Sequence, residues 1–151
     1  MTRVCLVGSE DVRLRGELLS RETAREALAT YDLREPYRNT VGVETISLGA
    51  AVALCNDLDW YLVRFAEDAL VLEPSVSETD WLSRDLAEAV RDGQIEPEAT
   101  DEYLKVYGLT DDDELVEPMY LARRDGELPD YDLREVSDTV VVRVTESEFA
   151  G

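Results

Sequence analysis

Residues 60–74 read WYLVRFAEDALVLEP and decide the fold class. Two segments rich in apolar, aromatic and β-branched residues, Trp60–Phe65 and Ala69–Glu73, flank the three residues Ala66–Asp68. Two such segments with a short connection predict a β-hairpin, which Pro74 would end because proline cannot donate a strand hydrogen bond. A hairpin cannot belong to a fully parallel sheet, so the sequence favours a mixed, mostly antiparallel one.

Four further segments have the composition of strands. Arg3–Val7 is short and apolar, and Val41–Ile46 alternates and is rich in β-branched residues. Leu115–Ala122 and Thr139–Val144 are the remaining two, since β-branched and aromatic residues fit a pleated surface. Pro118 would place its strand at an edge or at a bulge of the sheet.

Two serines mark expected starts of helices. Ser20 would cap a helix over residues 21–30, and Ser47 would cap one over residues 48–56, because a serine hydroxyl accepts a hydrogen bond from the first helical N–H groups. The second segment is apolar on nearly every side, which predicts a buried helix.

The middle of the chain predicts a pair of helices. Ser77 and Asp80 have the spacing of a capping box, and Trp81–Val90 forms one apolar stripe. Gly93 would end that helix, and Pro97–Tyr107 keeps helical spacing for a second one. Two consecutive helices joined by a short turn form an αα-hairpin.

The length of 151 residues and the apolar fraction of 44% fit a single compact domain over residues 1–151. The predicted order is β-α-β-α-β-β-α-α-β-β, in which strands outnumber helical crossovers. We therefore predict an α+β fold: a mixed, mostly antiparallel sheet with helices packed on one face, including a β-hairpin and an αα-hairpin.

Acidic residues dominate the composition. The chain has 35 Asp and Glu residues against 15 Lys and Arg residues, a formal net charge of -20, and no histidine. The lack of histidine excludes Ser-His-Asp and Cys-His catalysis and His-ligated zinc. So negative a chain repels nucleic acids and anionic membranes, and neither is an expected partner.

The basic residues are almost all arginine, and Lys105 is the single lysine. Acidic residues are spread along the whole chain, which suits hydration of the surface in molar salt, where the Debye length is about 3 Å. A partner-binding acidic surface, as in a nucleic-acid mimic, is the alternative. We favour adaptation to salt and expect the fold to loosen when salt is removed.

No metal and no cofactor are expected. Cys5 and Cys55 are the only cysteines, and each lies in an apolar segment without a CxxC partner, so both are interpreted as small buried residues. Asp111–Glu114 lacks the spacing of a calcium loop and is interpreted as solvated surface. No stretch resembles a signal peptide or approaches the roughly 20 apolar residues of a membrane span, so the cytoplasm is the expected compartment.

The pentapeptide YDLRE occurs twice, at Tyr31–Glu35 and at Tyr131–Glu135. Each copy precedes a predicted strand. Either the chain enters two strands through the same kind of loop, or Arg34 and Arg134 converge on one anion in a pseudo-symmetric site. We favour the first interpretation.

A second candidate anion site follows the first predicted strand. Gly8 and Ser9, followed by Arg13 and Arg15, could seat a phosphate at the start of a helix. The loop lacks the GxGxxG and GxxxxGK[ST] patterns, so a plain turn is the competing interpretation. The candidate ligand-binding residues are Gly8, Ser9, Arg13, Arg34 and Arg134, and no catalytic residue is assigned.

The lone Lys105, the two YDLRE segments and the segment Trp60–Pro74 together resemble a small uncharacterised (domain-of-unknown-function) protein family of halophilic archaea. The resemblance covers most of the chain. It implies a cytoplasmic, salt-adapted protein and brings no activity and no site residues with it.

Two functions stay open. We favour a non-enzymatic protein-binding or regulatory domain that recognises a protein partner or its own copy, because the sequence has no catalytic constellation and a free sheet edge is expected near Pro118. The alternative is an enzyme or sensor for a small phosphorylated ligand, bound by the loop after the first strand and by Arg34 and Arg134.

Overall fold

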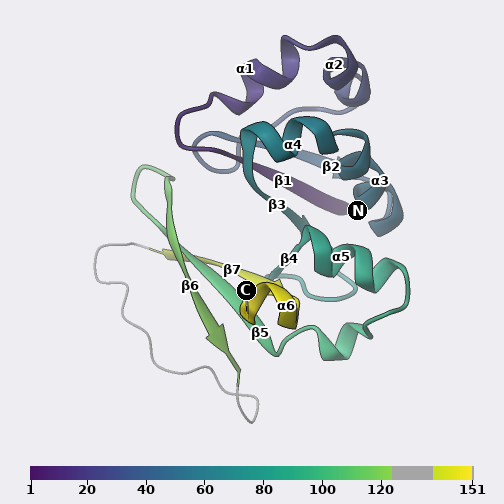
Figure 1. Ribbon diagram of the computed structural model, residues 1–151, viewed down its shortest axis with the longest axis vertical. Coiled ribbons are helices and arrows are strands. Elements are labelled where there is room, and N and C mark those ends of the chain that lie inside the picture. Colours follow the sequence, from purple (N-terminus) through teal and green to yellow (C-terminus); the bar gives the residue numbers. More distant parts are fainter. Residues whose placement is uncertain (124–137, 151) are drawn as a thin grey trace.

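The computed structural model of the protein describes residues 1–123 and 138–150 (Figure 1). The strands in this part are β1 (Thr2–Gly8), β2 (Thr40–Thr45), β3 (Ala66–Leu72), β4 (Trp81–Ser83), β5 (Tyr103–Leu109), β6 (Leu115–Ala122) and β7 (Asp138–Val144). They form one seven-stranded sheet in the order β2-β1-β3-β4-β7-β5-β6. Only β4 and β7 run parallel among the described pairs.

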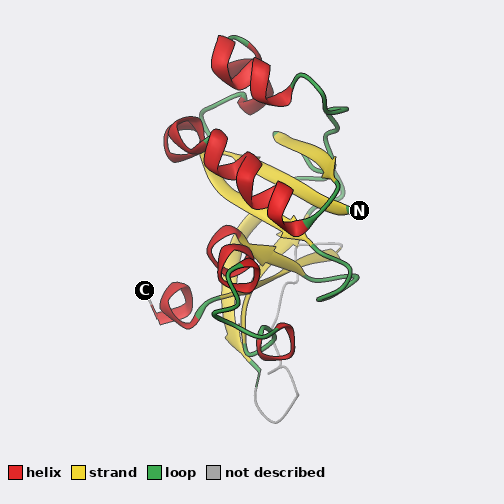
Figure 2. Cartoon of the chain, turned by 90° about the vertical axis from the view of Figure 1, so that its right-hand side faces the viewer, coloured by secondary structure: helices red, strands yellow, loops and turns green. Residues whose placement is uncertain are grey.

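The helices of the described chain are α1 (Leu14–Leu19), α2 (Glu22–Leu28), α3 (Leu48–Asp57), α4 (Asp59–Phe65), α5 (Arg84–Arg91) and α6 (Glu146–Ala150), with a single 3-10 turn at Pro97–Ala99. Buried side chains of α3, α4 and α5 belong to one apolar cluster with those of β1, β2 and β3, and Figure 2 shows the helices beside the sheet. The predicted α+β class, with a mixed and mostly antiparallel sheet, is confirmed. None of the described helices has the length and apolar character needed to cross a membrane.

Two apolar clusters lie on opposite faces of the sheet. Val4 of β1 and Val71 of β3 pack against the helices, whereas Cys5 and Leu70, the next positions along the same strands, face the other way. Successive side chains of a strand alternate between faces, so each strand contributes to both clusters. The second cluster also contains Trp81 of β4, Val142 of β7 and Tyr107 of β5, so it extends across the sheet from β1 to β5.

The predicted hairpin over residues 60–73 is wrong in its first half. Ala66–Leu72 is strand β3, but Asp59–Phe65 is helix α4. Leu58, Leu62 and Phe65 recur at helical spacing and pack into the core. A short apolar segment suits a strand or a packed helix equally well, and here tertiary packing outweighs β-propensity. The β-hairpin of this fold is instead β5–β6.

The predicted αα-hairpin is also wrong. Trp81–Ser83 is strand β4, and the helix that follows, α5, begins after Ser83, whose hydroxyl accepts from the N–H of Leu86 at 3.1 Å. Residues 103–107 belong to strand β5. Leu104 and Tyr107 are buried on opposite faces of this strand, so apolar residues are not confined to one face and the segment also fits helical spacing.

The capping and edge predictions had mixed outcomes. Ser47 caps α3 by accepting from the N–H of Ala50, as predicted. Ser20 does not cap α2: it follows α1, a helix that the sequence did not indicate, and its hydroxyl donates to the carbonyl of Glu17. Pro118 lies in β6, which is an edge of the described sheet and carries an irregularity in its register with β5, as predicted.

Candidate functional site

The loop after β1 is filled by a side chain of the protein itself. The carboxamide oxygen of Asn39 accepts from the N–H of Leu14 at 3.0 Å, and its nitrogen donates to the carbonyls of Ser9 and Val12 at 3.1 and 2.7 Å. A Cβ at position 8 would lie 2.5 Å from this nitrogen, so only glycine lets the Asn39 carboxamide lie this close to the end of β1. Asn39 therefore bonds the first turn of α1, where a phosphate was predicted.

The candidate arginines lie at different places in the fold. Arg13 is exposed just before α1. Arg34 pairs through its backbone with Gly42, at 2.7 and 2.8 Å, and its guanidinium lies 3.7 Å from Asp32. Arg134 lies outside the described residues. An anion site formed by Arg34 and Arg134 therefore stays a prediction.

A polar cluster links β3 and β5, which are not neighbours in the sheet, on the face opposite α3. Lys105 Nζ of β5 donates to Asp68 Oδ2 of β3 at 2.5 Å, and the hydroxyl of Tyr107 donates to the same oxygen at 2.8 Å. The lysine and aspartate side chains are only 15% and 12% exposed. Burial, and then the negative charge of Asp68, raise the pKa of Tyr107 far above its ordinary value, so the phenol stays a hydrogen-bond donor.

The sequence did not predict this cluster, because its members come from strands that are far apart in the chain. The amino-acid composition did contain one indication of the cluster. A chain with 15 basic residues retains a single lysine, and that lysine is the one in the cluster. An ammonium group is compact, whereas a guanidinium is wide and planar, so the two are not interchangeable at a confined site.

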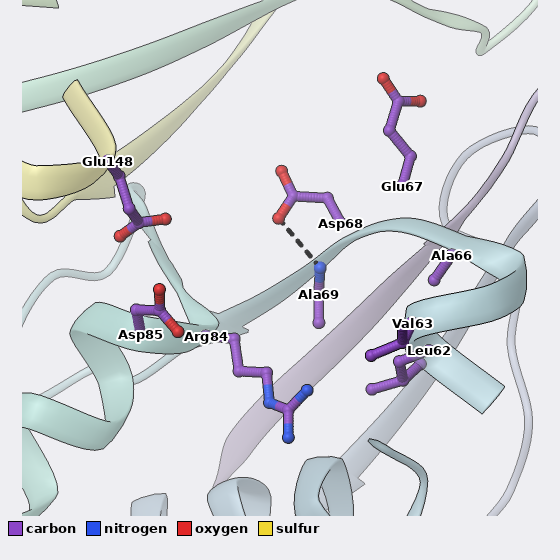
Figure 3. Close-up of a pocket in the computed structure, with 9 residues that line it drawn as sticks. All are labelled: Leu62, Val63, Ala66, Glu67, Asp68, Ala69, Arg84, Asp85 and Glu148. Carbon is purple, nitrogen blue, oxygen red and sulfur yellow. Dashed lines mark hydrogen bonds between the residues drawn. The ribbon is translucent and has the colours of Figure 1, made fainter. Parts of the chain in front are cut away.

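A cavity of about 210 Å³ lies beside this cluster (Figure 3). Its charged lining groups are Asp68, Glu67, Arg84, Asp85 and Glu148. Arg84 is already engaged, at 2.7 Å from Asp59 and 3.0 Å from Asn56. The volume is below the roughly 300–1,000 Å³ typical of ligand pockets, and the four charged lining groups other than Arg84 are carboxylates, which disfavours an anionic ligand here.

A larger hollow of about 550 Å³ lies between the end of β1 and the β5–β6 hairpin. Four glutamates line it, at positions 10, 67, 114 and 117, together with Arg38, which lies 3.7 Å from Glu114. No group of three or more His, Cys, Asp or Glu side chains within the described residues could hold a metal ion.

Both cysteines are buried, as predicted. Burial raises the pKa of Cys5 to about 12, with a smaller opposing effect of a hydrogen bond with Thr40. Burial likewise raises the pKa of Cys55 to about 11, and the nearby Arg84 charge opposes that shift. A thiol with such a pKa is not a nucleophile near neutral pH.

The outer face of α4 carries an exposed aromatic and basic surface. Trp60 is 49% exposed and Val63 is 72% exposed. The guanidinium carbon of Arg64 lies 3.7 Å from the centroid of the Trp60 ring, and that of Arg21 lies 5.9 Å from it. We call Trp60, Val63, Arg64 and Arg21 the Trp60 surface. The sequence did not reveal it, because residues 60–65 were interpreted as a strand.

Unpaired arginines gather on the elements around this surface. Within residues 1–123 and 138–150, each basic side chain other than those of four arginines forms an ion pair. The four exceptions precede or lie on α1, α2 and α4: Arg13, Arg15, Arg25 and Arg64. In a chain with 35 acidic residues, arginines without a carboxylate partner are unexpected.

Comparisons with known proteins identify a family but no characterised relative. The searches of curated proteins and of solved structures found no match to this chain. The model of a family described as a family of unknown function, DUF5804, matches residues 2–109, from β1 through β5. The matched region includes the Trp60 surface and the cluster of Asp68, Lys105 and Tyr107. The chain therefore belongs to this family of unknown function, DUF5804.

Proposed function

We propose that the protein is a non-enzymatic protein-binding module and that it binds its partner through the Trp60 surface. The observation that carries the proposal is the half-exposed Trp60 ring under the Arg64 guanidinium. Tryptophan and arginine are enriched among the residues that dominate binding energy in protein interfaces. The exposed half of an indole offers on the order of 100 Å² of apolar surface, which contributes about 2–3 kcal/mol when buried.

The surface is partly preorganised for binding. Arg64 Nη1 donates to the carbonyl of Trp60 at 2.8 Å, and Arg21 is held by Glu17 at 3.3 Å. Side chains that are already held lose less conformational entropy when a partner docks. The rigid indole and the positioned guanidinium groups therefore favour a defined partner surface.

The arginines on α4 and on or just before the neighbouring helices α1 and α2 indicate the chemistry of the partner. Arg13, Arg15, Arg25 and Arg64 have no carboxylate partner within the described residues. Guanidinium groups bind carboxylates through paired hydrogen bonds. We expect the partner to present aspartate or glutamate side chains around an apolar contact for Trp60.

Photo-crosslinking tests this proposal. p-Benzoylphenylalanine at Val63 should form a discrete adduct in an extract of the source cells in molar KCl, and Trp60→Ala or Arg64→Glu should abolish it. The matched control places the same crosslinker at Ile46, which is 84% exposed on another part of the chain. Equal adducts at both positions, or adducts that persist in both variants, would refute the proposal.

The phosphorylated-ligand alternative has weaker support, because Asn39 already bonds the first turn of α1. A thermal-shift screen with nucleotides and sugar phosphates in molar KCl separates the two functions. A shift of several degrees that disappears in Arg34→Ala and Arg134→Ala would favour the alternative. No shift with any ligand would leave the protein-binding proposal.

We further propose that the acidic excess is an adaptation to molar salt. It is supported by the spread of 35 acidic residues over the chain and by the retention of a single, largely buried lysine. Carboxylates keep a surface hydrated in concentrated salt, where screening weakens their mutual repulsion. The cytoplasm as the compartment and halophilic archaea as the source stay predictions.

A further inference from the structure

Strand β6 ends the described sheet and has β5 as its sheet neighbour. An edge strand presents unpaired backbone groups, which natural proteins protect with charged side chains, prolines or bulges. Here Pro118 and the irregular register protect the first half of β6. The second half, from Met119 to Ala122, contains no charged residue and no proline.

The register with β5 decides which backbone groups face outward. Directly beyond β6, the N–H of Arg123 donates to the carbonyl of Glu102 at 2.7 Å, so this pair is hydrogen-bonded. Bonded and non-bonded pairs alternate along an antiparallel ladder, and Leu121 is therefore the next residue that bonds β5. The N–H and C=O groups of Tyr120 and Ala122 point away from β5, toward the edge of the sheet formed by the described residues.

The side chains of this half-strand are apolar and incompletely covered. Tyr120 is 48% exposed, and Met119 and Leu121 are half-buried. Glu117 is the one charged residue among the eight of β6. This strand is poor in charge for a chain in which 33% of residues are charged.

We propose that β6 pairs with β6 of a second copy of this chain, antiparallel and across a two-fold axis at Leu121. This register places Tyr120 opposite Ala122 of the partner subunit, so the outward N–H and C=O groups of both residues form four hydrogen bonds in the dimer. The register leaves Pro118 outside these pairs. It also brings Leu121 beside Leu121 of the partner subunit, a close cross-strand apolar contact.

Charge favours a second copy at this edge. Two chains with a net charge of -20 repel each other, and the repulsion is smallest where the facing surfaces carry few carboxylates. The second half of β6 has none, and molar salt screens the remainder. This dimer goes beyond the proposed function and does not use the Trp60 surface.

Sedimentation equilibrium of the full chain in 2 M KCl tests the dimer. We expect a species of twice the 17.0 kDa chain mass. Tyr120→Pro removes an outward N–H while leaving the hydrogen bonds between β5 and β6 in place, and it should yield a folded monomer. Trp60→Ala is the matched control and should leave the dimer intact, so a failed dimer and a failed partner site are distinguishable.

Amide hydrogen exchange provides a second measurement if the proline variant fails to fold. In the wild-type chain, the amides of Tyr120 and Ala122 should exchange at least tenfold more slowly at high than at low protein concentration, whereas the Leu121 amide should not change. A monomer at all concentrations would overturn the proposal. A dimer in which these two amides exchange independently of concentration would overturn it as well.

Discussion

Replacing Lys105 with methionine removes the ammonium group that compensates the Asp68 carboxylate of β3. Asp68 would keep the hydrogen bond from Tyr107 but would remain a poorly hydrated charge. Loss of one partner from a buried ion pair typically costs 3–5 kcal/mol, and the residual exposure of 15% and 12% places this pair near the lower end, at about 3 kcal/mol. For a chain of this size that corresponds to a decrease of roughly 6–12 °C in Tm.

The double variant Lys105→Met, Asp68→Asn shows how much of the stability loss comes from the unpaired Asp68 charge and how much from lost packing of the lysine. The asparagine removes the charge and keeps an oxygen that can accept from Tyr107, so the double variant should be more stable than Lys105→Met by about 1–2 kcal/mol. Urea unfolding at constant KCl concentration measures both, since urea leaves the ionic strength unchanged. Arg3→Met is the control: it breaks an exposed pair with Glu44 and should change stability by less than about 0.5 kcal/mol.

Two results would refute this account of the cluster. One is a Lys105→Met variant that unfolds at the same urea concentration as the wild type. The other is a double variant that is less stable than Lys105→Met, which would mean that the carboxylate is stabilising even without its cation.

Three further predictions concern other buried or partly buried groups. Cys5 and Cys55, whose pKa values are raised to about 12 and about 11, should not react with Ellman's reagent at pH 8 until urea unfolds the chain; rapid reaction of the native protein would contradict their burial. Burial alone would raise the pKa of Glu73, but hydrogen bonds, the largest of them from Thr2, lower it on balance. A lowered folded-state pKa stabilises the fold above the ordinary carboxyl pKa, and this stabilisation is lost as the pH falls through the lowered value. The stability advantage of the wild type over Thr2→Val should therefore shrink when urea unfolding is repeated below pH 4, and a constant difference would contradict the role of Glu73. Asn39→Ala should reduce the free energy of unfolding by about 2–4 kcal/mol, because three backbone groups lose a partner, and an unchanged urea midpoint would show that water replaces the amide.

Local sequence patterns predicted the strands whose side chains alternate or are β-branched, such as β2 and β7. They failed where two kinds of element share one pattern. Residues 60–65 are apolar enough for a strand, and only the core contacts of Leu62 and Phe65 favour a helix. Residues 103–107 place apolar side chains on both faces of the sheet, so their spacing fits a helix as well as a strand.

The candidate sites were harder to predict than the fold class, because they depend on contacts between distant segments. Asp68 and Lys105 are 37 residues apart, and Asn39 reaches Val12 across 27 residues. The Trp60 surface requires a helix, since only a helical turn places Arg64 over Trp60 at a spacing of four residues. Composition alone did isolate one relevant residue, the single lysine.

The salt dependence of stability tests most directly the central claim that the acidic excess serves hydration in concentrated salt. The free energy of unfolding, measured with urea, should rise steadily as KCl increases from 0.1 M to 3 M, because the Debye length falls from about 10 Å to below about 3 Å and the repulsion within the -20 chain weakens. A fold that is equally stable at 0.1 M and 3 M KCl would contradict the claim, and the carboxylates would then need a different explanation.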